Sequence, residues 1–205
     1  MNRRDLLTRR VPPLASVLPT GGELKGKGSP ARGARAGYFP NYEMTTHEGK
    51  KIRFYDDVIH GDKIVVINMM YAQCEGICPP MTANLTRVKK LLGDRVGRDI
   101  FLYSITLKPQ QDTPQALRHY AQMHKAGPDW VFLTGDPAEI DVLRRKLGFY
   151  DVDPKFDKDV SQHIGMLRVG NEAIDRWIGC PALANPEQIA KSILWMQSPK
   201  MRSRA

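Results

Sequence analysis

Residues 63–79 read KIVVINMMYAQCEGICP, an apolar run that leads into two closely spaced cysteines. The run 63–70 is β-prone and apolar throughout, which predicts a buried strand. The residues that follow Cys78 have the pattern of an amphipathic helix, so Cys74 and Cys78 lie on a strand-to-helix turn. Backbone N–H groups and the helix dipole favour negative charge there. We therefore expect at least one of these thiols to have a lowered pKa.

The spacing of the two cysteines leaves more than one chemistry open. A four-residue step places both side chains on one side of a nascent helical turn, close enough to form a disulfide or to share one metal ion. Thiol–disulfide exchange sites usually have two residues between the cysteines, and this chain has three. The wider spacing suits a shared soft metal. Two unreactive core cysteines, or a plain structural disulfide, are the simpler alternatives.

The rest of the chain predicts an α/β fold. A run of strands and helices surrounds the cysteine turn, and a hairpin and a last helix follow it. This is the order of a thioredoxin-like fold with a mixed central sheet flanked by helices, an N-terminal extension and insertions. We predict strands at 50–55, 63–70, 99–107 and 130–133; helices over 81–92, from Asp112-Thr113-Pro114 to about 125, 136–147 and 186–196; a polar loop at 151–162; and a hairpin of 165–169 and 173–178 around Gly170-Asn171.

The charge distribution divides the chain into three parts. The net charge is +9, but residues 1–36 hold eight Lys/Arg against two acids, and 200–205 hold three Lys/Arg. The remaining 37–199 are neutral, with 20 basic and 20 acidic residues, which argues against nucleic-acid binding. We therefore expect a signal-like or disordered basic segment at 1–37, one thioredoxin-like domain at 38–197 and a basic tail at 198–205.

The N-terminal segment has features of an export signal. Arg3 and Arg4 precede leucines, as at the start of a twin-arginine signal, but the apolar stretch that follows, 11–19, is short and broken by prolines. We expect a periplasmic protein or one at the outer face of the inner membrane, with a cytoplasmic protein that has a disordered basic tail as the alternative. No stretch of about 18 apolar residues predicts a transmembrane helix, and membrane association stays open.

A copper site at the cysteines would need a further ligand, because Cu(II) favours added nitrogen where Cu(I) accepts thiolates. His163 is the candidate, since it ends the polar loop just before the predicted strand at 165–169, which a thioredoxin-like sheet would bring towards the cysteine turn. His119 and His124 are predicted on a solvated helix surface. The other two histidines, His47 and His60, are predicted in turns.

Several other residues invite a site but have a simpler interpretation. Cys180 is expected to be an unpaired structural thiol, with a resolving cysteine or an accessory ligand as the alternatives. Methionines near the cysteines could outline a thioether path, but methionine on strand and helix faces is ordinarily core. The acidic loop lacks the glycine and final glutamate of a calcium-binding loop, so we expect it to be solvated. The methionines are Met69, Met70, Met81 and Met166; the acids are Asp151, Asp153, Asp157 and Asp159.

Taken together, these motifs resemble the Sco/SenC family of copper-binding assembly proteins over roughly residues 38–197. The resemblance is carried by Cys74-Glu75-Gly76-Ile77-Cys78-Pro79, by 103–107 leading to Asp112-Thr113-Pro114, by Phe132-Leu133-Thr134-Gly135 and by His163. It implies a copper chaperone that binds one ion, Cu(I) or Cu(II), through Cys74, Cys78 and His163. Two positions depart from the family pattern: Lys108 stands where many members have an acid, and Pro80 follows Pro79.

The resemblance also implies a client, the copper-containing subunit of cytochrome c oxidase or of a similar copper enzyme, and leaves room for a separate copper donor or thiol reductant as a partner. The alternative function is a thiol–disulfide oxidoreductase, in which Cys74 attacks and Cys78 resolves to keep the partner's copper-ligating cysteines reduced. A thiol peroxidase is disfavoured, because no arginine arrangement in the sequence suggests a peroxide pocket.

Overall fold

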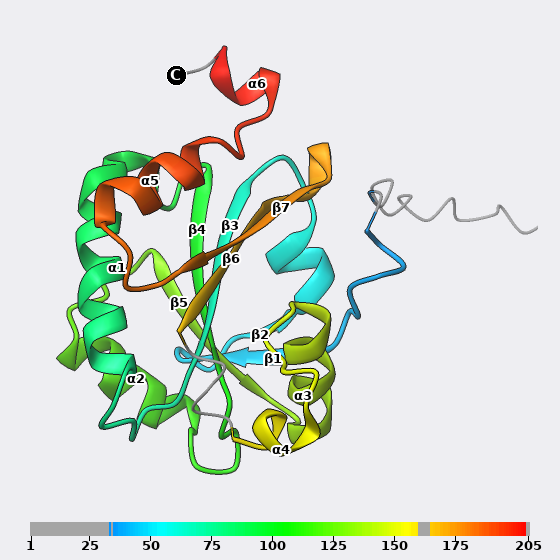
Figure 1. Cartoon of the computed structure of the whole chain (residues 1–205), viewed down its shortest axis with the longest axis vertical. Coiled ribbons are helices and arrows are strands. Elements are labelled where there is room, and N and C mark those ends of the chain that lie inside the picture. Colours follow the sequence, from blue (N-terminus) through cyan, green and yellow to red (C-terminus); the bar gives the residue numbers. More distant parts are fainter. Residues whose placement is uncertain (1–32, 34, 160–164, 204–205) are drawn as a thin grey trace, which may run out of the picture. The chain divides into compact units, whose positions relative to one another are not determined.

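The computed structural model describes residues 33, 35–159 and 165–203, which all belong to the compact unit Arg32–Ala205. Its centre is a seven-stranded sheet with the strand order β2-β1-β5-β4-β3-β6-β7 (Figure 1). Three neighbouring strands at the middle are parallel, and the outer pairs are antiparallel. The predicted α/β fold with a mixed sheet is confirmed.

The parallel strands form the core because their residues are apolar on both faces. They are β3 (Ile64–Met70), β4 (Ile100–Thr106) and β5 (Trp130–Gly135), and every residue of β3 is buried. A series of side-chain hydrogen bonds crosses this core. The Trp130 Nε1 donates to Ser104 Oγ at 2.8 Å, and that hydroxyl donates to Asn68 Oδ1 at 2.7 Å, so these buried polar groups are satisfied.

Helices cover both faces of the sheet (Figure 1). The helices α1 (Cys78–Leu92), α2 (Pro114–Met123) and α5 (Pro186–Leu194) share one face, where α1 packs against α5 and Thr82 of α1 hydrogen-bonds Tyr120 of α2 at 2.8 Å. The helix α3 (Pro137–Lys146) lies on the other face. All four helices have proline in the first turn, and Thr113, Asp136 and Asn185 cap α2, α3 and α5.

The segment before β3 differs from the prediction of one strand at 50–55. Two short strands form there, β1 (Glu43–Thr46) and β2 (Lys51–Arg53), and the chain then turns into a π-helix, Phe54–Ile59. The prediction missed β1 because its sequence, Glu-Met-Thr-Thr, is too short to show a clear period. The π-helix forms where four of its six side chains are buried, so packing overrides the alternating pattern.

The C-terminal hairpin is confirmed, but its turn is displaced. It consists of β6 (Met166–Asn171) and β7 (Arg176–Pro181), joined by a 3₁₀ turn at Glu172–Ile174 rather than at Gly170-Asn171. Gly170 is needed within β6, because a Cβ there would lie 2.2 Å from Cε3 of Trp177. The Asn171 side chain caps the 3₁₀ turn instead of forming the hairpin loop.

Residues 151–159 of the acidic loop are mostly exposed, as the sequence predicts, and Asp157 is the exception. A short helix, α4 (Pro154–Asp157), forms within it, capped by Asp153. Asp157 is buried and accepts from Arg144 Nη1 at 2.6 Å and Nη2 at 3.0 Å, and it also pairs with Arg145. The two arginines hold the pKa of Asp157 far below its ordinary value, chiefly through the hydrogen bond from Arg144. These bonds attach the loop to α3.

The chain after α5 turns into a further short helix, α6 (Pro199–Arg202), where Met201 and the capping Ser198 are buried. Ser198 Oγ donates to Asp62 Oδ2 at 2.9 Å, which connects α6 to the turn before β3. Within the part of the chain that the structure describes, no helix is long and apolar enough to cross a membrane.

Candidate functional site

The two cysteines lie where the buried central strand gives way to a helix. β3 ends at Met70, the turn runs over residues 71–77, and α1 begins at Cys78. Cys74 is 6% exposed and Cys78 is fully buried, and both are free thiols. The predicted strand-to-helix turn is confirmed, with Pro79 and Pro80 in the first turn of α1, where their missing N–H groups cost no hydrogen bond.

The two thiols have opposite acidities. Burial acts to raise the pKa of Cys74, but hydrogen bonds from the side chain and backbone of Cys78, from the backbone of Gly76 and from Tyr71 outweigh it, and the pKa is lowered. Burial, followed by the hydrogen bond with Cys74, raises the pKa of Cys78 to about 12. Cys74 is therefore the sulfur that ionises first, and Cys78 is the thiol that donates to it.

Tyr71 is a site residue that the sequence did not single out. Its hydrogen bond with Cys74, followed by burial, raises the pKa of Tyr71 to about 12, so the phenol remains a donor to the sulfur at neutral pH. Lys108 Nζ lies 3.9 Å from the centroid of the Tyr71 ring. A cation is thus stacked on the tyrosine that hydrogen-bonds Cys74.

Asp112 is the second residue that sequence reasoning missed, because it looked like part of a helix cap. The cap of α2 is Thr113, and Asp112 instead faces the cysteine turn, with 2% of its surface exposed. Its Oδ2 accepts from Ala72 N at 3.0 Å and from Thr106 Oγ1 at the end of β4. One buried carboxylate therefore ties the turn before Cys74 to the neighbouring parallel strand. A signal was present in the sequence, since an acid follows the strand next to the cysteine strand, where carboxyl ends meet at one edge of the sheet.

His163 lies outside the described residues, so the structure does not place it. The next described residue, Gly165, does lie at the cysteine turn, because a Cβ on it would lie 3.5 Å from Cδ1 of Ile77. Among residues 33, 35–159 and 165–203, no group of three His, Cys, Asp or Glu side chains is arranged to hold a metal.

The other four histidines hold structural or surface positions. His47 is buried, and its Nδ1 accepts from Phe132 N at 3.2 Å. His124 stacks on Tyr120 with 4.2 Å between ring centroids, and His119 is exposed on α2. His60 follows the π-helix, 5.8 Å from the Tyr55 ring.

The remaining sulfur residues behave mostly as expected. Cys180 is a free, half-buried thiol on β7 opposite Leu167, and burial raises its pKa. Met69, Met70 and Met81 are fully buried in the core. Met166 is the exception, because it is 41% exposed at the start of β6.

This arrangement suits two kinds of chemistry. An easily ionised sulfur next to a second thiol can attack a disulfide, with the second thiol ready to resolve the product. The same two sulfurs are soft ligands, which favour Cu(I) among the first-row metals. The geometry of the cysteine turn alone supports both.

Comparison with known proteins identifies the family of the chain. Residues 31–196 match the family model described as SCO1/SenC. A SCO1 protein homolog of Bacillus subtilis is 31% identical over 102 residues, which are 46% of this chain and 50% of that protein. The aligned segment thus spans about half the length of that relative.

Solved structures agree on the fold. The structure of yeast Sco1 with copper bound superposes with a TM-score of 0.60 at 17% identity, covering 84% of this chain and 98% of that one. The structure of BsSco, described as a member of the Sco family of cytochrome c oxidase assembly proteins with a disulfide switch, gives a TM-score of 0.58 at 21% identity, covering 76% and 90%. At these identities the superpositions show a shared fold.

Proposed function

Because this chain belongs to the SCO1/SenC family, we propose that it binds one copper ion through Cys74, Cys78 and His163 and assists assembly of the copper centre of cytochrome c oxidase or a related copper enzyme. Copper is the cargo in this function. The paired arginines Arg3 and Arg4 support an extension of the proposal, that the protein acts in the periplasm or at the outer face of the inner membrane.

The observation that carries the proposal is the reduced pair of cysteines at the carboxyl end of β3. Cys74 has a lowered pKa, and Cys78 lies within hydrogen-bonding contact of it. Two thiolates satisfy Cu(I), which accepts soft ligands and low coordination numbers. Cys78, which is fully buried, would hold the ion from within, whereas Cys74, which is 6% exposed, is the ligand that a partner protein can displace.

The third ligand is supported by the position of the chain just after His163. Gly165, the next described residue, lies at the cysteine turn, where a Cβ on it would lie 3.5 Å from Cδ1 of Ile77. An imidazole nitrogen added to two thiolates is a donor set that holds Cu(II) as well as Cu(I). Ion release would then occur by stepwise exchange of these ligands for those of the client.

A second candidate, a thiol–disulfide oxidoreductase, is favoured by the opposite acidities of the two cysteines. The Cys74 thiolate would attack a partner disulfide, form a mixed disulfide and release one partner thiolate, which takes up a proton. Cys78 would then lose its proton and attack the Cys74 sulfur, which frees the second partner thiolate and leaves a Cys74–Cys78 disulfide. Loss of the Cys74 charge in the mixed disulfide removes one cause of the raised Cys78 pKa and so eases this step.

Metal reconstitution of the full chain tests the proposal. The reduced protein is loaded anaerobically with Cu(I), and separately with Cu(II), and its copper content and visible absorption are measured. We expect one tightly held copper per chain and a thiolate-to-Cu(II) charge-transfer band. The band should disappear in His163→Ala and persist in His119→Ala, a matched control in which an exposed helical histidine is removed.

A different outcome of the same measurements would refute the proposal. A protein that retains no copper but rapidly reduces a model disulfide, with activity lost in Cys74→Ser and unchanged in His163→Ala, would refute the chaperone function. The oxidoreductase would then be the function of this site.

A further inference from the structure

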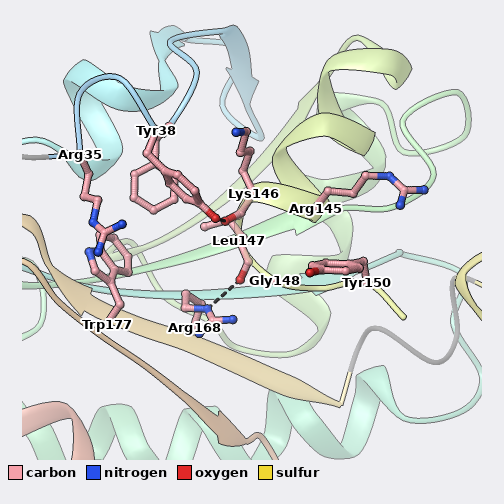
Figure 2. A pocket seen from close by; sticks show the side chains of 10 residues that line it. Arg35, Tyr38, Arg145, Lys146, Leu147, Gly148, Tyr150, Arg168 and Trp177 are labelled. Atoms are coloured by element: carbon pink, nitrogen blue, oxygen red, sulfur yellow. Dashed lines mark hydrogen bonds between the residues drawn. The ribbon is translucent and has the colours of Figure 1, made fainter. Parts of the chain in front are cut away.

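A pocket separate from the cysteine turn lies where three parts of the chain meet (Figure 2). Its walls come from residues 35–39 before β1, from residues 145–150 at the end of α3, and from Arg168 and Trp177 of the β6–β7 hairpin. Its volume is about 280 Å³, enough for a small organic ligand but not for a dinucleotide. None of its lining residues belongs to the turn around Cys74 and Cys78.

The pocket has an excess of positive charge. Four basic side chains line it and no acidic one does, within the part of the chain that the structure describes. Arg35 is paired with Asp175, and Arg145 belongs to the cluster in which Arg144 and Arg145 are balanced by Asp141 and Asp157.

The two other basic residues, Lys146 and Arg168, are not balanced in this way. Neither has a carboxylate within 4.0 Å among residues 33, 35–159 and 165–203. Two uncompensated positive charges therefore lie on the walls of a cavity large enough to hold a ligand, and Figure 2 shows the Lys146 side chain pointing away from Arg168.

Arg168 is fixed in position before any ligand arrives. Its Nε donates to the Leu147 carbonyl at 2.7 Å, drawn as the dashed line in Figure 2. Gly148 has a φ of +79°, and a Cβ there would lie 2.2 Å from Arg168 Nη2, so glycine permits the close approach of the guanidinium. The Nη1 and Nη2 groups have no hydrogen-bond acceptor among the described residues. A guanidinium held by Nε with both Nη groups unused is suited to bidentate binding of an oxyanion.

Aromatic rings provide the apolar part of the pocket. The Tyr38 hydroxyl donates to the Lys146 carbonyl at 2.9 Å, and Lys146 Nζ lies 4.8 Å from the centroid of the same ring. Phe39 packs on Trp177 with 4.9 Å between ring centroids, and Trp177 in turn packs over Gly170. These contacts hold the rings as fixed walls, against which a planar or apolar group can lie.

We propose that this pocket binds a phosphate monoester, whose phosphate pairs with Arg168 while its organic part lies against Tyr38 and Trp177, and the charge of Lys146 adds to the attraction without contacting the same oxygens. Phosphate is favoured over a carboxylate because a monoester carries close to two negative charges at neutral pH, so the positive charge of the pocket attracts it more strongly. The phosphate belongs either to a small soluble compound or to the headgroup of a membrane lipid, and the two sources share this chemistry.

Calorimetric titration of the full-length protein with phenyl phosphate tests the proposal, with benzoate and phenol as comparison ligands. We expect saturable binding of one phenyl phosphate, weaker binding of benzoate and none of phenol. Arg168→Gln should weaken phenyl phosphate binding about tenfold or more, and Lys146→Gln by a smaller factor. Arg176→Gln, which removes the same charge from an exposed position of β7 outside the pocket, is the matched control and should bind like the wild type.

Two further measurements keep the result interpretable. Arg168→Lys retains the charge but loses the fork, so it should bind between the wild type and Arg168→Gln. Unchanged circular dichroism of each variant separates a local loss from unfolding, and Lys146→Gln, at an exposed position, tests the site if Arg168 variants do not fold. The proposal is overturned if folded Arg168→Gln and Lys146→Gln bind phenyl phosphate like the wild type, or if benzoate binds as tightly as phenyl phosphate.

Vesicle sedimentation distinguishes the two sources. Vesicles that contain phosphatidic acid are compared with vesicles of phosphatidylcholine alone. Binding to phosphatidic acid that is lost in Arg168→Gln and kept in Arg176→Gln assigns the phosphate to a lipid headgroup. Phenyl phosphate binding without vesicle binding assigns it to a soluble compound, and binding of neither refutes the site.

Discussion

Replacing Asp112 measures how much its two hydrogen bonds at the cysteine turn contribute to the free energy of unfolding. Its buried carboxylate accepts from Ala72 N at 3.0 Å and from the Thr106 hydroxyl. A hydrogen bond to a charged group contributes about 1.5–3 kcal/mol, so two bonds set an upper bound of about 3–6 kcal/mol. The Thr106 oxygen also accepts from Lys108 N at 2.9 Å, and Asp112→Ala leaves that bond in place. We expect Asp112→Ala to lower the free energy of unfolding by about 3 kcal/mol.

Urea unfolding of the reduced, metal-free protein measures this loss, through the midpoint and the slope of the transition. Asp112→Asn should lose only about 1 kcal/mol, because its side-chain oxygen can take the place of Oδ2 and still accept from both Ala72 N and Thr106 Oγ1, now as a neutral acceptor. The matched control is Asp136→Ala, which removes an exposed acid that accepts from Ala138 N and Glu139 N at the start of α3 and should cost about 1 kcal/mol. If Asp112→Ala costs no more than Asp136→Ala, Asp112 does not anchor the turn.

Two further predictions concern ionisation. The pKa of Cys74 is lowered and those of Cys78 and Cys180 are raised, so iodoacetamide should alkylate Cys74 first. The alkylation rate of Cys74 should reach half its maximum at a pH below the ordinary thiol pKa. Mass spectrometry of quenched samples measures the rate at each cysteine, and a Cys180 that reacted as fast as Cys74 would contradict the prediction. Asp157→Asn should lower the free energy of unfolding at pH 7 by about 3 kcal/mol, because Arg144 loses its buried partner. The folded-state pKa of Asp157 is depressed, so this stabilisation is present above its unfolded pKa of about 4 and is lost as the pH falls through the folded value; a difference from wild type that grew in acid would contradict the assignment.

The parts of the fold that the sequence predicts well are those where one physical signal dominates. The apolar runs of β3 and β4 predict buried strands and show no helical period. Proline with a capping residue marks the start of α2, α3 and α5. The turn of the β6–β7 hairpin was misplaced because Gly170 looks like a turn residue. Its lack of a side chain serves Trp177 across the hairpin, and that pairing is visible only after the strands are aligned.

The candidate site likewise contains residues that the sequence identifies and one that it does not. Cys74 and Cys78 are only four positions apart in the sequence, so their spacing and the strand before them were enough to identify them. Asp112 lies 40 residues from the amide that it binds, and its neighbours Thr113 and Pro114 are typical of a helix start. A side chain whose partner comes from another strand cannot be recognised from local pattern, and Asp112 therefore required the structure.

The unequal acidity of the two cysteines has a consequence for how metal binding depends on protons. Between the lowered pKa of Cys74 and the pKa of about 12 of Cys78, the pair carries a single negative charge and retains one proton. A soft cation that binds both sulfurs must expel that proton, so each ion loaded acidifies its surroundings by one equivalent. Uptake is then favoured in alkaline surroundings and release in acidic ones, by about tenfold per pH unit. A local fall in pH beside a client would on this account help to transfer the ion without any change in the fold.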